Sequence, residues 1–182
     1  WPWQYGVDMT PFTIIPEGKI GLVLSKDGTG IPTGRILARY VDSDSFQDAQ
    51  KFLDNGGQRG RQTAYITAGS YRINSFLFDV TIADQIIINE NMVGIITSLD
   101  GQPIPQGKIA GSNVEGHNNF QDIDTFMNNG GCRGLQPQVI LAGSYYINPW
   151  AVQIEENPMT DVPIGHVGVV ISYIGEDGID VT

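Results

Sequence analysis

Apolar positions follow two different periods along the first 80 residues. Residues 20–24 form a short run of strand-forming side chains that ends at the turn Asp27-Gly28. Phe46, Ala49 and Phe52 instead recur at helical spacing, which predicts an amphipathic helix of about three turns over residues 45–55. Side chains of residues 42–45 are suited to cap its N-terminus, and the glycines after Asn55 are suited to end it. The pattern therefore predicts strands on either side of one helix.

Three further strands are expected around this helix. Residues 36–41 precede it, and residues 63–66 and 71–80 follow it, with Ala68-Gly69-Ser70 as a hairpin-type turn between the last two. The complete order is strand, strand, short helix, strand, strand.

The same pattern occurs twice. Residues 46–74 match residues 120–148 at a spacing of 74, and the segments before them match at 73. The shared letters include Phe-Gln-Asp, Asn-Gly-Gly, Arg-Gly, Gln and Ala-Gly-Ser-Tyr. In the second copy the expected first strand is residues 92–97, and Asn118 or Asn119 is expected to cap the helix. Such self-similarity is typical of tandem supersecondary units.

A third copy begins near Val162, where residues 163–170 align with residues 16–23. We therefore expect an α+β fold of tandem β-rich repeats, each mainly antiparallel strands plus one short helix. The predicted divisions are an aromatic lead-in (1–14), repeat 1 (15–84), repeat 2 (85–158) and the start of repeat 3 (159–182). Loops near 81–90 and 155–161 are expected to mark the boundaries.

Composition narrows the functional classes. The net charge is −10, and residues 81–182 carry all of it, with 2 basic and 12 acidic residues. This argues against nucleic acid or anionic lipid as a direct partner of the second half. No apolar run reaches the roughly 18 residues of a membrane-spanning helix. Trp1, Trp3 and Tyr5 fit either a membrane interface or a cap over the first repeat's core.

Oxygen-bearing side chains suggest one metal site, at Asp42, Asp44 and Asp48. Calcium loops place oxygen ligands at alternate positions, but this stretch lacks the central glycine and the closing glutamate of such a loop. The second copy has Asn113, Glu115, His117 and Asn119 in this region. Helix capping therefore explains the cluster better than a metal does.

Two glycine-rich stretches invite a phosphate-binding interpretation, and neither supports it. Residues 28–34 contain no Gly-Lys-Ser/Thr and do not have G-x-G-x-x-G spacing. Residues 55–60 follow a helix, so their amides do not point a helix N-terminus at an anion.

No catalytic constellation is apparent. His117 and His166 lie in different copies, and Cys132, the one cysteine, lies apart from both and replaces Gln58, as a variable surface position would. The pair Glu155-Glu156 lies in an expected linker. We assign no catalytic, cofactor-binding or metal-binding residue, and no cofactor.

Arg59 and Arg133 occupy the same place in both copies, beside the glycines that end each helix. They are expected to bond the last helix carbonyls. The alternative is docking of one repeat or subunit onto another through a carboxylate.

Three short motifs resemble the stomatin–prohibitin–flotillin superfamily, also called band-7 proteins. Residues 15–23 and 162–170 are similar to its opening Pro-x-Gly-x-Val-Gly-Val-Val strand. Residues 142–149 are similar to its Pro-Gly-x-Tyr/His-x-x-Asn-Pro turn, and residues 68–74 nearly so, with Ser75 in place of the last proline. Tandem copies are similar to the large bacterial flotillin-like proteins and to the vault shell protein. The resemblance implies a parent protein with a membrane anchor before Trp1, a helical tail and self-assembly into rings or cages.

The sequence-based hypothesis is a non-enzymatic scaffold portion of a membrane-anchored, flotillin-like protein that forms homo-oligomers and organises membrane microdomains. This portion would itself be soluble, and the anchor would lie outside it. In a scaffold, Trp150 should be a core residue. The alternative is a glycan-binding module of a secreted or surface protein that uses exposed Tyr71, Tyr145, Tyr146 and Trp150.

Overall fold

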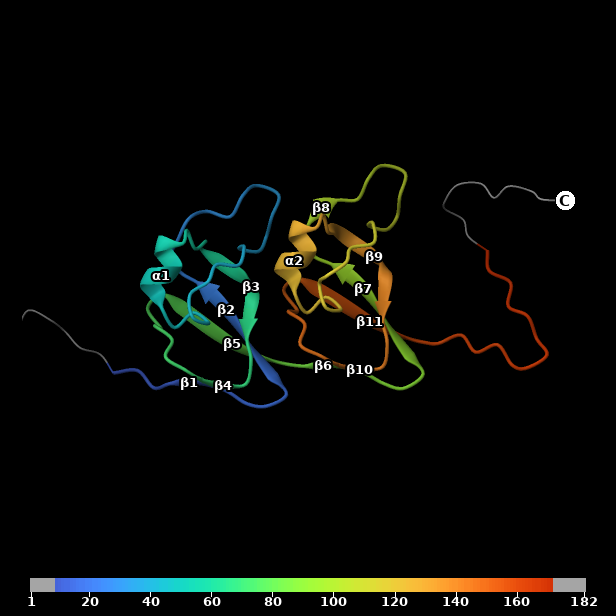
Figure 1. Cartoon of the computed structure of the whole chain (residues 1–182), viewed down its shortest axis with the longest axis horizontal. Helices are drawn as coiled ribbons and strands as arrows, with labels where there is room; N and C mark the ends of the chain where they lie inside the picture. The colour runs from blue at the N-terminus through green and yellow to red at the C-terminus, as the bar shows by residue number, and fades with distance from the viewer. Residues whose placement is uncertain (1–8, 172–182) are drawn as a thin grey trace, which may run out of the picture. The chain divides into compact units, whose positions relative to one another are not determined.

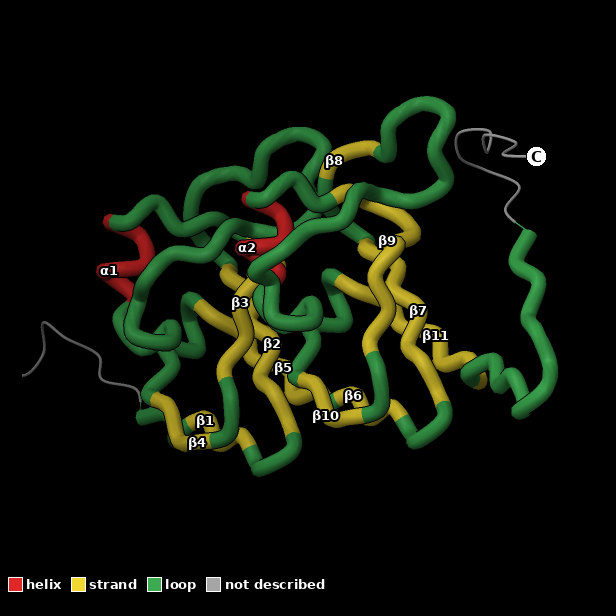
Figure 2. The backbone as a smooth tube through the Cα atoms, turned by 45° about the vertical axis from the view of Figure 1, so that its right-hand side comes forward, coloured by secondary structure: helices red, strands yellow, loops and turns green. Residues whose placement is uncertain are grey.

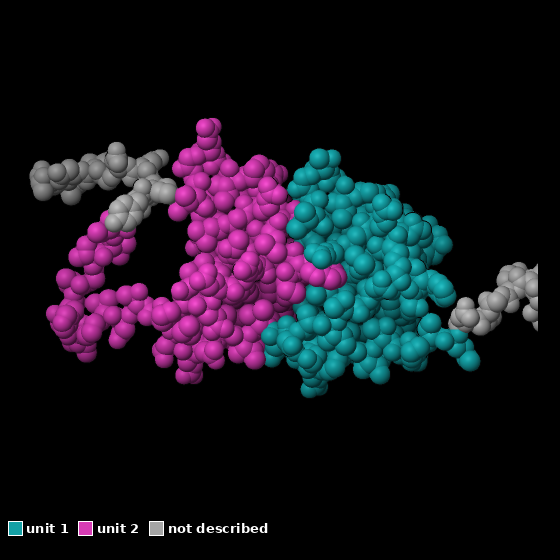
Figure 3. Space-filling view, turned by 180° about the vertical axis from the view of Figure 1, so that it is seen from behind, with its two compact units in different colours: residues 1–85 teal, residues 86–182 magenta. Residues whose placement is uncertain are grey.

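The computed structural model describes residues 9–171, and the chain divides into two compact units, residues 1–85 and 86–182 (Figure 3). The architecture is mixed and mostly β, with antiparallel sheets and two short helices (Figure 1). The expectation of a mainly antiparallel α+β fold is confirmed at this level. The expectations for Trp1, Trp3 and Tyr5 lie outside the described residues.

Unit 1 is built around one central strand. Its elements are β1 (Thr13–Ile15), β2 (Lys19–Ser25), α1 (Ala49–Asp54), β3 (Gly60–Ile66), β4 (Gly69–Tyr71) and β5 (Phe78–Asp84). Strand β2 lies between β3 and β5 in an antiparallel sheet, and β1 pairs separately with β4. An apolar run bordered by turns is typical of such a central strand, because both of its edges are paired.

Unit 2 has its own central strand, β7. Its elements are β6 (Ile86–Ile88), β7 (Met92–Ser98), β8 (Gln102–Pro103), α2 (Ile123–Asn128), β9 (Cys132–Ile140), β10 (Gly143–Tyr145) and β11 (Val152–Pro158). Strand β7 pairs antiparallel with β9 and β11, the two-residue β8 pairs parallel with β9, and β6 pairs with β10.

In each unit, the residue that follows the last strand bonds to the turn that precedes the central strand. Gln85 N donates to Gly18 O at 2.9 Å in unit 1, and Met159 N donates to Asn91 O at 2.8 Å in unit 2. The chain therefore leaves each unit beside the turn through which it entered the central strand.

Three aromatic rings form the centre of each core. In unit 1, the ring centroid of Phe52 on α1 lies 5.0 Å from that of Phe78 on β5 and 6.0 Å from that of Phe46. In unit 2, Phe126 from α2 packs at 5.3 Å from Phe120 and 5.6 Å from His117. Ring pairs at these separations contribute beyond the area they bury.

The helices are shorter than predicted and begin later (red in Figure 2). Asp48 caps α1, so the expectation of a cap within residues 42–45 is wrong. Asp122 caps α2, so the expectation of Asn118 or Asn119 is wrong as well. The reason is that residues 44–46 and 118–120 have left-handed backbones, with φ between 48° and 63°. Such a backbone cannot continue into a right-handed helix.

Other predicted elements also changed. Residues 36–41 form no strand and make only an isolated bridge at Ala38. Gly69 and Ser70 belong to β4 rather than to a turn, and residues 74–77 form the turn that divides the strand expected over 71–80. Strands β5 and β6 occupy most of the loop expected over 81–90. Residues 159–171 contain no strand.

Candidate functional site

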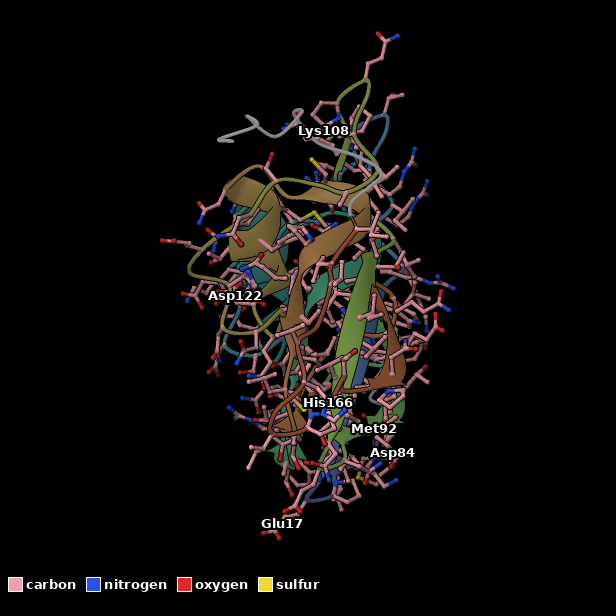
Figure 4. The ribbon with its side chains drawn as sticks, turned by 90° about the vertical axis from the view of Figure 1, so that its right-hand side faces the viewer. Glu17, Asp84, Met92, Lys108, Asp122 and His166 are labelled. Carbon is pink, nitrogen blue, oxygen red and sulfur yellow. The ribbon has the colours of Figure 1, made fainter. Side chains whose placement is uncertain are left out.

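The Phe-Gln-Asp motif before each helix bonds to the residue that directly follows the short strand β4 or β10. Gln47 Oε1 accepts a hydrogen bond from Arg72 N at 3.1 Å, and Gln121 Oε1 accepts one from Tyr146 N at 2.9 Å. Asp48 and Asp122 accept from the third helical amide at 2.8 and 2.9 Å; Figure 4 labels Asp122. The left-handed turn before the motif places Phe46 and Phe120 in the cores, 3% and 1% exposed. These residues are used for folding.

A buried glutamine holds the bend at the start of β3 and β9. Gln62 Nε2 donates to Gln58 O at 2.8 Å and Gly60 O at 2.9 Å. Gln136 Nε2 donates to Cys132 O and Gly134 O, both at 2.7 Å. The glutamine shared by both copies therefore satisfies backbone carbonyls around a register shift, as buried polar groups must be satisfied.

The acidic residues considered as a calcium site are engaged in other bonds. Asp42 bonds to Lys51 Nζ at 2.6 Å, and this bond lowers the pKa of the Asp42 carboxyl and raises the pKa of Lys51. Asp48 caps α1. Within residues 9–171 no group of three or more His, Cys, Asp or Glu side chains is placed to hold a metal.

The glycine-rich stretches serve backbone packing. A methyl added at Gly28 would lie 2.4 Å from Gly57 O, and one added at Gly57 would lie 2.3 Å from the Phe52 ring. Thr29 N also donates to Gly57 O at 2.8 Å. The loop over residues 28–34 and the turn after α1 are therefore fastened to each other, and both need glycine for close approach.

His117 is a core residue. It is 4% exposed, and its Nδ1 accepts from Phe120 N at 2.8 Å. Its Nε2 therefore carries the proton, which it donates to Val114 O at 2.9 Å. His166 lies in the exposed segment after β11 (Figure 4). The structure does not bring the two histidines into one site.

Cys132 was expected at a variable surface position, and this is wrong. It begins β9 and is 6% exposed, and Gln58 at the matched place is 7% exposed. Both positions lie next to the buried glycine that follows the helix, so the difference between them is accommodated inside the protein.

Arginine does bond the end of α1, but from another position. Arg39 Nη2 donates to Asn55 O at 3.2 Å and to Gly56 O at 3.3 Å. The interpretation of Arg59 as the residue that bonds these carbonyls was therefore assigned to the wrong arginine in unit 1. Arg59 and Arg133 both have exposed side chains.

Two of the three tyrosines proposed to bind a glycan, Tyr71 and Tyr145, each lie over the glycine that begins their own short strand. Tyr145 donates its hydroxyl to Leu141 O at 2.9 Å, and a methyl on Gly143 would lie 3.2 Å from that hydroxyl. Tyr71 lies over Gly69 in the same way. Trp150 is half-buried, so its expected core position is wrong.

The outer face of the unit 2 sheet presents apolar side chains. We define this outer face as Val93, Ile95 and Thr97 of β7 with Leu135 and Val139 of β9. Val139 lies opposite Ile95, and Leu135 lies opposite Thr97, so they share one side of the sheet. Leu135 is 37% exposed and Val139 is 48% exposed, and the three β7 residues are half-buried.

No protein-family model, curated protein or solved structure matches the chain. Over residues 9–171, none of the helices has the length and hydrophobicity needed to cross a bilayer. The functional interpretation therefore depends on the residues themselves.

Proposed function

We propose that this chain is a non-enzymatic scaffold built from tandem copies of one β-rich unit, which assembles with further copies of the same chain through its sheet faces. The parent protein would be a membrane-associated, flotillin-like scaffold that organises membrane microdomains. The family portion of this proposal comes from the three motifs that resemble band-7 proteins.

The observation that carries the assembly proposal is the outer face of unit 2. Four of its five residues are aliphatic, and two of them are more than one-third exposed. Contiguous exposed apolar surface of this kind is typical of interaction sites. A face of a β-sheet also suits repetitive units, because each unit buries the surface that the preceding one leaves exposed.

Charge favours a second copy of the chain as the occupant. Residues 81–182 have 2 basic and 12 acidic residues, whereas residues 1–80 have 8 of each. Glu155 lies directly opposite Ile95, so a carboxylate borders the outer face. Unit 1 of another copy meets this acidic border with less repulsion than a second unit 2 does, which favours head-to-tail assembly.

The matched residues support tandem copies. Residue pairs that share a letter also share a structural role, since Asp48 and Asp122 cap helices, and Gln62 and Gln136 bond a strand bend. These roles concern the stability of each unit, and they leave the sheet faces for association.

Sedimentation velocity over a range of concentrations tests the assembly. We expect the chain to form larger species as its concentration rises, and the double variant Leu135→Glu/Val139→Glu to remain a single chain. Ile109→Glu is the matched control, because Ile109 is 60% exposed and belongs to unit 2 but lies in a loop outside the outer face. A single-chain mass at every concentration, or equal loss in the control, contradicts the proposal.

Membrane association is tested separately, by fractionating source cells with an antibody against this chain. Sedimentation of the parent with membranes, and its release by detergent as a large assembly, would support the scaffold. A parent that remains a small species free of membranes would contradict the family portion of the proposal.

A further inference from the structure

Residues 160–171 repeat the entry into the central strand of both units. Pro163-Ile-Gly-His aligns with Pro16-Glu-Gly-Lys and with Asn89-Glu-Asn-Met. In unit 1 this turn joins β1 to β2, and in unit 2 it joins β6 to β7. After Met159 the chain instead continues without a strand, as the orange-to-red trace in Figure 1.

The turn itself is formed in all three places. His166 N donates to Pro163 O at 3.0 Å, as Lys19 N donates to Pro16 O at 3.3 Å and Met92 N donates to Asn89 O at 3.2 Å. The third residue of each turn has a positive φ, 86° at Gly165, 73° at Gly18 and 63° at Asn91. The segment thus has the local geometry of a central-strand entry without the sheet.

Its apolar side chains lack the cover that their counterparts have. Val170 is 93% exposed, whereas the matched Val23 and Ile96 are each 0% exposed. Val162 is 47% exposed, and its counterparts Ile15 and Ile88 are each 2% exposed. Burying apolar side chains of this size stabilises a protein, so their exposure favours association with a partner.

The space beside Gly168 indicates which side chain the partner strand would place there. A methyl on the matched Gly21 would lie 2.6 Å from Ile66 Cγ1 of β3, and one on Gly94 would lie 2.6 Å from Ile140 Cγ1 of β9. Glycine at this position therefore leaves room for an isoleucine from the neighbouring strand. Among residues 9–171, the atom nearest to a methyl added at Gly168 is Val162 Cγ2 at 3.3 Å. That contact is the counterpart of Ile15 over Gly21, and none of these residues supplies the isoleucine of the neighbouring strand.

We propose that residues 166–171 are an insertion strand, which becomes the central strand of a β-sheet whose two flanking strands come from a polypeptide with the pattern of residues 33–85. That pattern is a short helix carrying a buried phenylalanine, followed by a strand with isoleucine at the place of Ile66 and by a strand equivalent to β5. The proposal names a partner beyond the outer face, and it does not require self-assembly.

A chimera tests this directly. Asp177-Gly178 is similar to Asp27-Gly28 but lies three residues farther from Val170 than Asp27 lies from Val23, so residues 33–85 appended after Thr182 restore the pattern with a turn three residues longer while the full chain is kept. Hydrogen–deuterium exchange is then measured on the amides of residues 166–171. We expect exchange at least about 100-fold slower in the chimera than in the natural chain, because amides bonded on both sides of a central strand exchange only on opening.

Gly168→Val supplies the matched control. In the chimera it should abolish the protection, because the added side chain takes the isoleucine's place. In the natural chain it should change little, whereas Gly94→Val should destabilise unit 2. Unchanged exchange in the chimera, or full protection in the Gly168→Val chimera, overturns the proposal. Protection in the natural chain that rises with concentration also overturns it, because β3 and β5 of a second copy are already paired with their own β2, so the segment would have paired with something other than two free flanking strands. None of these outcomes depends on the Leu135 and Val139 variants that test the proposed function.

Discussion

The two units reach the same three-ring core with different residues. In unit 1 the third ring is Phe78 on β5, 5.5 Å from Phe46. The matched position in unit 2 is Val152, and the third ring is His117, 4.2 Å from Phe120. His117 corresponds to Ser43 of unit 1, which lies before the left-handed turn. One ring has been lost from the strand side of the core and another gained from the loop side.

This exchange indicates that the volume of the core is constrained more strongly than the identity of each position. Cores tolerate repacking when their total volume is kept. A histidine can replace a phenylalanine ring here because both ring nitrogens have partners, Val114 O and Phe120 N. An unsatisfied imidazole at the same place would cost the desolvation of its polar atoms.

The largest effect is expected when only one of the two ring positions is changed, so that unit 1 loses its third ring without gaining the histidine of unit 2. Phe78→Val alone should destabilise unit 1 by about 3 kcal/mol, since it leaves a cavity beside Phe52. Adding Ser43→His should recover part of this loss, so that the double variant is more stable than the sum of the single variants predicts. Native-state hydrogen exchange, read on α1 and β3, measures the change for unit 1 alone.

Unit 2 supplies the converse experiment. His117→Ser should destabilise it, and Val152→Phe in the same chain should recover part of the loss. Strictly additive effects in both units would mean that the rings do not share one cavity, which would contradict the comparison.

A smaller effect, equal in the two units, is expected from the helix caps. Asp48→Ala and Asp122→Ala should each cost about 1 kcal/mol, because each leaves a first-turn amide without its acceptor. Asp48→Ser and Asp122→Ser should retain most of the stability, since serine also caps. A negligible loss in either alanine variant, measured by the same hydrogen exchange, would show that the left-handed turn positions that helix without its cap.

The smallest expected effect is a difference between the two units in how their stability depends on pH. Asp42 and Lys51 form an ion pair in unit 1, whereas Gly116 and Thr125 occupy the matched places in unit 2. Because the bond from Lys51 lowers the pKa of Asp42, its stabilising contribution is present above the ordinary carboxyl pKa and is lost as the pH falls through the lowered value.

Lys51→Thr should therefore raise the pKa of the Asp42 carboxyl toward its ordinary range, as measured by NMR titration. The effect should weaken with added salt, because the pair is exposed. An unchanged Asp42 titration would show that the ion pair does not form in solution.

Much of the sheet was predictable from the sequence, but the left-handed turn that precedes each helix was not. The apolar runs of β2 and β7 are bordered by turns, so their type and limits follow from composition. Phe46 was assigned to the helix because its spacing to Phe52 is helical. Its position in a left-handed turn arises from tertiary packing, which periodicity does not record. Asp44 and Asn118 are residue types that tolerate this backbone.

The candidate site shows a similar division. The capping role of Asp48 follows from its residue type, although the cap was expected within residues 42–45. The buried Cys132 was mistaken for a surface residue because one difference between two copies was taken as a sign of exposure. The ring exchange explains why that argument fails, since buried positions also vary when a neighbour compensates. The outer face of unit 2 was not predicted, and the signal was the apolar Leu135 and Val139 at alternating places of β9.

The bonds from Gln85 to Gly18 and from Met159 to Asn91 have a consequence for how such a chain can evolve. Since the polypeptide leaves each unit beside its point of entry, residues 86–159 form a segment whose removal joins Gln85 to Thr160, the residue aligned with Ile86. The residues that remain then still follow the same sequence pattern without an interruption. Duplication of the same segment would likewise preserve it, so a chain with one such segment more or fewer would need no new linker.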